Sequence, residues 1–142
     1  MKFKNILFPT DFSNDSEKAR DYVLYLSEEL KATVHILHVI EPLEYSEVDE
    51  EIQAFYDDLK TKLSKKMKNE IMHFNNRDIK TKTNLIIGKR WIEINEYAAK
   101  NNIDLIIMGS HGIRNKKGEL LVGTTSHKVV FTSPCPLLLI RD

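Results

Sequence analysis

The chain has 142 residues, of which 42% are hydrophobic and 30% charged, a composition that suits one domain of ordinary size. Lysine plus arginine and aspartate plus glutamate both number 21, so the formal net charge is zero, which argues against nucleic acid or an anionic membrane as the main partner. No apolar run approaches the roughly 18 residues of a membrane span, and the N-terminus lacks a signal-peptide pattern. A single cysteine excludes an internal disulfide and fits a reducing compartment. We therefore expect one cytoplasmic domain over residues 1–142.

The first half of the chain alternates apolar runs with segments of helical periodicity. Residues 5–9 predict a short buried strand, and Asn-Asp-Ser-Glu at 14–17 offers a capping box for a helix whose apolar positions recur from Ala19 to Leu30. Residues 33–40 predict a second inner strand because they are β-branched and apolar. A long helix is predicted over about 46–75, with its charged face toward water. Its apolar face consists of Val48, Ile52, Phe55, Tyr56, Leu59, Leu63, Met67, Ile71 and Phe74.

The second half continues the alternation. Strands are predicted over 80–87, 105–108 and 136–140, and helices over about 91–100 and 124–131. Strands that alternate with helices indicate parallel strands joined by right-handed crossovers. We therefore expect an α/β fold of the Rossmann-like kind, a three-layer, doubly wound domain with a five-stranded parallel sheet in the order 3-2-1-4-5. The last strand should lie at a sheet edge, and any ligand should sit beyond the carboxyl ends of the strands.

Glycines and hydroxyl residues gather after the fourth predicted strand. The apolar run that ends at Met108 is followed by Gly109-Ser110-His111-Gly112, a polar loop with several basic residues, and Gly123-Thr124-Thr125 at a helix start. Glycines let backbone N–H groups approach an anion closely, and a helix start adds free donors and a positive dipole end. The pattern predicts a nucleotide-binding loop, although the first two glycines alone would also suit a tight turn.

These motifs resemble the C-terminal signature of the universal stress protein family, in its ATP-binding branch. The family pattern is Gly, two residues, Gly, nine residues, Gly, then Ser or Thr; here ten residues separate Gly112 from Gly123, and a bulge at Gly118 would absorb the extra one. K-N-I-L-F-P-T-D-F-S is similar to the family's opening, L-H-V-I to its second strand end, and S-P-C-P-L-L-L-I-R to its final strand. The resemblance covers essentially the whole chain.

The resemblance implies a role for each candidate residue in binding ATP. The backbone of Val39 would read the adenine edge, and the Asp11 carboxylate would accept a hydrogen bond from a ribose hydroxyl beside Pro9 and Thr10. The phosphates would lie on Gly109 to Gly112 and on Gly123 to Thr125, and a magnesium ion carried in by the nucleotide is an open alternative. The predicted binding residues beyond Pro9, Thr10, Asp11 and Val39 are Met108, Gly109, His111, Gly112, Arg114, Gly123, Thr124 and Thr125. It also implies an antiparallel homodimer through residues 136–140.

Some of these residues also have ordinary structural interpretations. Asp11 follows a strand and precedes a helix, where an acidic residue often serves as a turn or cap residue. Arg114 belongs to a basic loop that would be solvated without a ligand, or could contact the outer phosphates through a bidentate hydrogen bond. Thr124 and Thr125 suit a helix cap, a role compatible with phosphate binding. His35 and His38 differ by three on a strand and therefore face opposite sides, which excludes a shared metal.

The sequence favours nucleotide-dependent stress signalling over catalysis, because no positioned base or nucleophile is evident. Any ATP hydrolysis should be slow. Two alternatives stay open. One is an interaction protein of the same fold that binds no nucleotide, its phosphate site closed by the extra loop residue. The other is an adenylyl-transferring enzyme, for which the segment Phe8 to Ser13 lacks both a glycine-rich loop and an H-x-G-H type signature.

Overall fold

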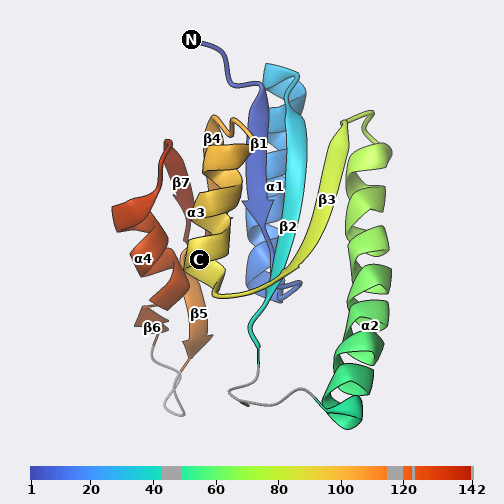
Figure 1. Cartoon of the computed structure of the whole chain (residues 1–142). Coiled ribbons are helices and arrows are strands. Elements are labelled where there is room, and N and C mark those ends of the chain that lie inside the picture. Colours follow the sequence, from blue (N-terminus) through green and yellow to red (C-terminus); the bar gives the residue numbers. More distant parts are fainter. Residues whose placement is uncertain (43–48, 115–119, 123, 142) are drawn as a thin grey trace.

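A parallel sheet of five strands forms the middle layer of the computed structural model (Figure 1). The structure describes residues 1–42, 49–114, 120–122 and 124–141, of which 111–114, 120–122 and 124 are described by their backbone alone. The strands of this sheet are β1 (Asn5–Pro9), β2 (Thr33–Ile40), β3 (Thr81–Ile87), β4 (Leu105–Gly109) and β7 (Leu137–Ile140). Their order, β3-β2-β1-β4-β7, confirms the predicted 3-2-1-4-5 arrangement and places the last strand at an edge.

Two pairs of helices cover the two faces of the sheet (Figure 1). The helices are α1 (Asn14–Leu30), α2 (Glu50–Asn75), α3 (Arg90–Lys100) and α4 (Thr124–Thr132). Strand residues alternate between the faces: Ile6 and Phe8 pack under α1 and α2, whereas Leu7 packs under α3 and α4. Because both faces are covered, each inner strand is an almost continuous apolar run, which is why these strands could be predicted from composition.

The helix starts differ in detail from the prediction. Ser13, not the 14–17 segment, caps α1: its hydroxyl accepts a hydrogen bond from the backbone N–H of Ser16, 3.4 Å away. Asp49 caps α2 in the same way, accepting from Ile52 N–H at 2.8 Å. The predicted start of α2 near residue 46 lies outside the described residues. Among the described residues, none of the helices combines the length and apolar character that a bilayer crossing requires.

The predicted apolar faces of the helices are only partly buried. On α1, Tyr22 is 51% exposed. On α2, Phe55 is 50% exposed, because the N-terminal part of α2 extends past the sheet (Figure 1) and the buried residues of this helix begin at Leu63. A buried ion pair between α1 and α2 was not predicted from the sequence. Glu70 of α2 faces inward and accepts two hydrogen bonds from Arg20 Nη1 of α1, at 3.0 and 3.1 Å.

The segment predicted as a polar loop after β4 contains a short antiparallel hairpin. Its strands are β5 (His111–Arg114) and β6 (Leu120–Val122). His111 pairs with Val122 and Arg114 pairs with Leu120. The two pairs are therefore three residues apart along β5 but only two residues apart along β6. A shift of this kind takes up one extra residue. It lies within β5, whereas the bulge predicted at Gly118 falls outside the described residues.

Candidate functional site

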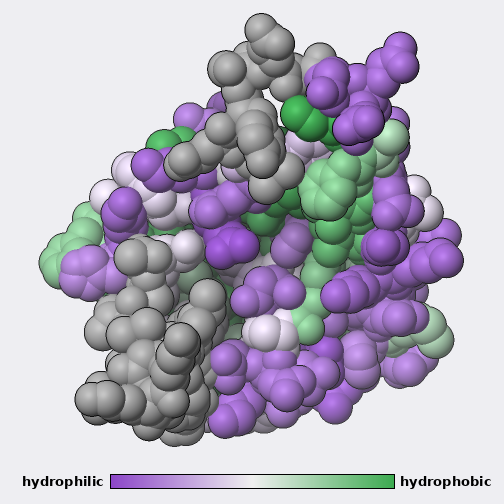
Figure 2. Space-filling model, turned by 90° about the horizontal axis from the view of Figure 1, so that it is seen from below, coloured by the Kyte–Doolittle hydropathy of each residue, from purple (hydrophilic) through white to green (hydrophobic). Residues whose placement is uncertain are grey.

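The carboxyl ends of β1 and β4 mark the point where the order of strands reverses. From β1 the chain builds outward through β2 to β3, and then adds β4 and β7 on the other side. In open α/β sheets, ligands bind beyond such a reversal. Figure 2 looks onto this end of the molecule and shows mainly hydrophilic side chains between the two segments drawn in grey, with hydrophobic surface on the side where α2 lies.

Thr10 fixes the first loop of this edge to β2. Its backbone N–H donates to Leu37 O at 2.9 Å, and its carbonyl oxygen accepts from His38 Nδ1 at 2.7 Å. Its hydroxyl accepts from Phe12 N–H at 3.0 Å, and the residue is 6% exposed. Thr10 therefore shapes the loop, and Pro9 and Thr10 directly precede Asp11, the residue predicted to bind the ribose.

Asp11 uses one carboxylate oxygen to build the turn and leaves the other free among the described residues. Oδ1 accepts from Ser13 N–H at 2.9 Å and from the Ser16 hydroxyl at 2.7 Å. Partial desolvation acts to raise the pKa of Asp11, but these hydrogen bonds, together with the positive charge of Arg90, outweigh it and hold the pKa below its ordinary value. Asp11 therefore acts as a turn residue, as one of the two interpretations of the sequence expects. Its side chain is also exposed, as binding to a ribose hydroxyl would require.

Val39 directs its backbone toward the space beyond the end of β1. In a parallel ladder, alternate residues point their N–H and C=O groups to opposite neighbours. Leu37 bonds toward β1 through Thr10, so Val39, two residues farther on, faces the same side where β1 has already ended. Its side chain is 5% exposed and packs in the core under α3 and α4.

Gly109 faces the same space from the other side. Ser110 N–H bonds to Ile140 O of β7, so Gly109, one residue earlier, directs its backbone groups toward β1. A Cβ at Gly109 would lie 3.6 Å from the carbonyl oxygen of Asp15, which places the end of β4 against the first turn of α1. Met108, one residue earlier, is 7% exposed, and its side chain packs in the core under α3 and α4.

The first turn of α4 is held against the end of β4. The Ser126 hydroxyl donates to Ser110 O at 2.9 Å, and Ser126 is 5% exposed. Thr125, one residue earlier, is half-buried. Sequence reasoning missed Ser126, although the run Thr-Thr-Ser at the start of α4 was a signal for it.

The remaining predicted residues are placed only by their backbone or not at all. His111, Gly112 and Arg114 lie in β5, and Thr124 begins α4, but their side chains are outside the description. Gly123 lies outside the described residues.

The two central histidines lie on opposite faces of β2, as predicted. His35 Nδ1 lies 2.7 Å from Tyr97 Oη and its Nε2 3.0 Å from Asn5 Oδ1, while His38 bonds to Thr10 on the other face. Burial lowers the pKa of both imidazoles. At His38 the hydrogen bond to the Thr10 carbonyl and the charge of Asp11 act to raise the pKa, but burial and the positive charges of Arg90 and Lys66 outweigh them. No group of three or more metal-ligating side chains occurs in the described ranges.

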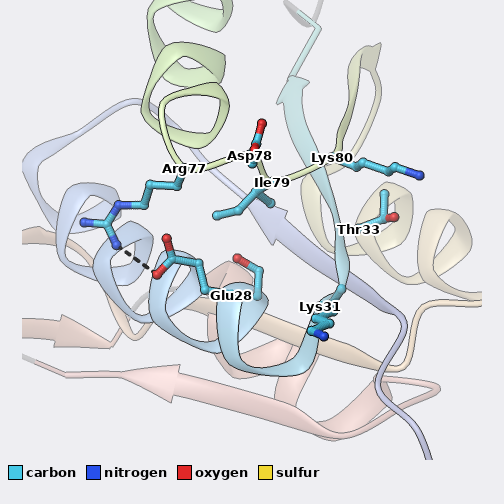
Figure 3. Close-up of a pocket in the computed structure, with 9 residues that line it drawn as sticks. Glu28, Lys31, Thr33, Arg77, Asp78, Ile79 and Lys80 are labelled. Carbon is cyan, nitrogen blue, oxygen red and sulfur yellow. Dashed lines mark hydrogen bonds and ion pairs between the residues drawn. The ribbon is translucent and has the colours of Figure 1, made fainter.

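Two adjoining hollows open at the opposite, amino edge of the sheet, with cavity volumes of about 380 and 760 Å³. The smaller lies between the ends of α1 and α2 (Figure 3). Its charged side chains do not converge: Arg77 reaches Glu28 at 3.4 Å, and Lys80 points away from both. The N–H groups of Ala32 and Ile79 are bonded to helix carbonyls, so this hollow offers an anion little.

The fold and the reversal edge define a doubly wound, Rossmann-like domain with a polar edge built from β1, β2, β4 and two helix starts. Comparison with known proteins is more specific. Residues 2–141 match the model of the universal stress protein family, and the chain belongs to that family.

Individual relatives extend over nearly the full length. Universal stress protein MJ0577 of Methanocaldococcus jannaschii is 31% identical over 98% of this chain and 95% of its own, and universal stress protein YxiE of Bacillus subtilis is 28% identical over 98% and 99%. The solved structure of the protein MJ0577 superposes with a TM-score of 0.89, at 32% identity over 100% of this chain and 98% of that chain. This likeness agrees with the observed strand order and layers.

Proposed function

We propose that this universal stress protein binds ATP at the reversal edge and acts in stress signalling. The adenine lies near Val39, the ribose at Asp11, and the phosphates over Gly109 to Gly112 and over Gly123 to Thr125. The other predicted contacts are those of Pro9, Thr10, Met108, His111 and Arg114.

One observation carries the proposal: the backbone groups of Val39 and Gly109 face the same space from opposite sides of β1. The first turn of α1 borders that space through its contact with Gly109. A helix start brings the positive end of the helix dipole, which suits phosphate. The shift within β5 also supports it, because an extra residue taken up inside the hairpin need not close the phosphate site.

Solved relatives support the nucleotide class. One universal stress protein is described in complex with cAMP, with a TM-score of 0.75 at 16% identity, and another, from Archaeoglobus fulgidus, in complex with dAMP, with a TM-score of 0.63 at 12% identity. Those ligands belong to those proteins. Both contain adenine, a sugar and a phosphate, the three parts that the proposed site would contact.

Signalling is favoured over catalysis because Asp11 is poorly suited to remove a proton. Its pKa is held below the ordinary value, and one oxygen is engaged by Ser13 and Ser16. A general base works best with a pKa near the operating pH. Slow hydrolysis at most, a magnesium ion arriving with the nucleotide, and a cytoplasmic location stay predictions.

Calorimetric titration tests the nucleotide proposal directly. At micromolar protein, MgATP is expected to release heat with a stoichiometry of one per chain and to raise the unfolding temperature, since a ligand of the folded state stabilises it. Inorganic triphosphate and adenosine serve as the two part-ligand controls. No heat and no thermal shift with MgATP would favour the interaction protein that binds no nucleotide.

We also propose that the chain forms a homodimer through β7. This strand lies at the sheet edge, and α4, which directly precedes it, exposes Val130 (47%) and Phe131 (75%). An apolar edge strand readily pairs with another chain. Because Ile140 O bonds to Ser110 of β4, the odd-numbered Leu139 directs its N–H outward.

Leu139→Pro tests the dimer, because proline removes that outward donor and is tolerated on an edge strand. Light scattering is expected to give twice the 16.5 kDa chain mass for the wild type and the single chain mass for the variant. Leu138→Val, on the same strand, is the control and should remain dimeric. A wild type that is monomeric at micromolar concentration contradicts the proposal.

A further inference from the structure

His38 contacts the Asp11 loop at two points, one on each side of Asp11. Its Nδ1 lies 2.7 Å from the carbonyl oxygen of Thr10, so that nitrogen must carry the proton and donate it. Its ring also packs on the ring of Phe12, with centroids 4.8 Å apart and planes tilted by 33°. Asp11 lies between these two contacts, and His38 itself is 9% exposed and anchored in β2.

Phe12 has a backbone conformation that needs such support. Its φ is +63°, in the left-handed region that a bulky side chain seldom adopts. Two contacts hold it there: its N–H donates to the Thr10 hydroxyl at 3.0 Å, and its ring packs against His38 and the core under α1. Strained residues of this kind persist only where the surroundings over-determine them. If Phe12 relaxed, the direction of the Asp11 side chain would change.

We propose that His38 and Phe12 are positioning residues that set the Asp11 carboxylate for the ribose of the bound nucleotide. Together His38 and Phe12 form a clamp on the Asp11 loop. This clamp keeps Asp11 Oδ1 hydrogen-bonded to Ser13 and Ser16 and leaves Oδ2 to accept a hydrogen bond from a ribose hydroxyl. This inference rests on the proposed nucleotide function. His38 and Phe12 would then determine how strongly the site prefers one sugar over another, without changing its affinity for the phosphates.

The test compares ATP with 2′,3′-dideoxy-ATP by calorimetry. The wild type is expected to bind ATP at least about tenfold more tightly than 2′,3′-dideoxy-ATP, because a hydrogen bond to a charged group contributes a free energy of that order. Asp11→Asn should weaken that hydrogen bond and so narrow the ratio of the two Kd values. His38→Leu should bring the ratio to within about twofold of one while the dideoxy nucleotide still binds. His35→Leu removes the other buried histidine of β2, on the opposite face, and should retain the wild-type ratio.

A His38→Leu protein with the wild-type ratio overturns the proposal. Should that variant not fold, Phe12→Leu removes the stacked ring from the other side and gives the same comparison. If the wild type does not bind ATP at all, the proposed function fails, and the clamp is then judged by amide hydrogen exchange. The Ser13 N–H, which Asp11 holds, should exchange at least tenfold faster in His38→Leu than in His35→Leu, and equal rates overturn the clamp.

Discussion

Replacing Glu70 by leucine is expected to lower the free energy of unfolding by about 3–5 kcal/mol, the range for leaving one charge of a buried pair without its partner. The side chains of Glu70 and Arg20 are 9% and 13% exposed, and the carboxylate is the hydrogen-bond partner of Arg20 Nη1. Arg20 Nε is already buried without a partner among the described residues, so the variant guanidinium would have little to bind. Urea denaturation monitored by circular dichroism measures the change.

Two further variants show whether the cost comes from the stranded charge. Asp58→Leu breaks the exposed pair with Lys62, whose side chains are 65% and 71% exposed, and should change stability by less than about 1 kcal/mol. The double change Arg20→Met with Glu70→Leu removes both charges and should recover most of the loss. A Glu70→Leu protein that is no less stable than Asp58→Leu would mean that the pair is not buried in solution.

The elements that the sequence predicted well are those with a local signal. Residues 33–40 form β2 with the predicted bounds, because a β-branched run under two helical layers has little alternative. The order of strands also followed, since short connections and right-handed crossovers allow few topologies. The burial of α2 was predicted too broadly: helical periodicity identifies Phe55 as part of the apolar face but does not say where the sheet ends beneath it.

The features that sequence reasoning missed depend on residues far apart in the chain. Arg20 and Glu70 are 50 positions apart, and each alone looks like a surface charge. The β5–β6 hairpin pairs two segments of three or four residues, one of which contains Gly112, a residue disfavoured in strands. Pairing of such short segments is decided by the surrounding fold and not by their own propensity.

The meeting of the candidate residues at one edge of the sheet was predictable, whereas the local geometry around them was not. Topology alone brings Asp11, Val39 and Gly109 to one edge, because each follows or ends a parallel strand. The left-handed conformation of Phe12 has no sequence signal, since glycine or asparagine is the usual residue there. The use of His38 as a support was equally hidden, because a histidine within an apolar strand gives no hint of its partner.

Replacing Gly109 by valine is expected to lower the affinity for ATP by at least about 100-fold, or roughly 2.7 kcal/mol, with little effect on the fold. The backbone φ at Gly109 is outside the left-handed region, and a Cβ there would make an ordinary contact of 3.6 Å with the Asp15 carbonyl oxygen. The first carbon therefore fits. The two γ-methyl groups of valine would occupy the space between the end of β4 and the start of α1, where a phosphate must approach the backbone.

Two other variants separate the loss of the site from the loss of the fold. Gly109→Ala adds only the carbon that fits, so its affinity should fall much less than that of the valine variant. Phe74→Leu removes volume from a fully buried side chain at the end of α2, beside the opposite, amino edge of the sheet. That variant should unfold at a lower temperature yet bind ATP within about threefold of the wild type, because Phe74 lies at the end of the sheet opposite to Asp11, Val39 and Gly109. Calorimetry and thermal unfolding of the three proteins give both quantities. A Gly109→Val protein that binds ATP as the wild type does would place the phosphates elsewhere and remove the main support for a nucleotide at the β1–β4 reversal.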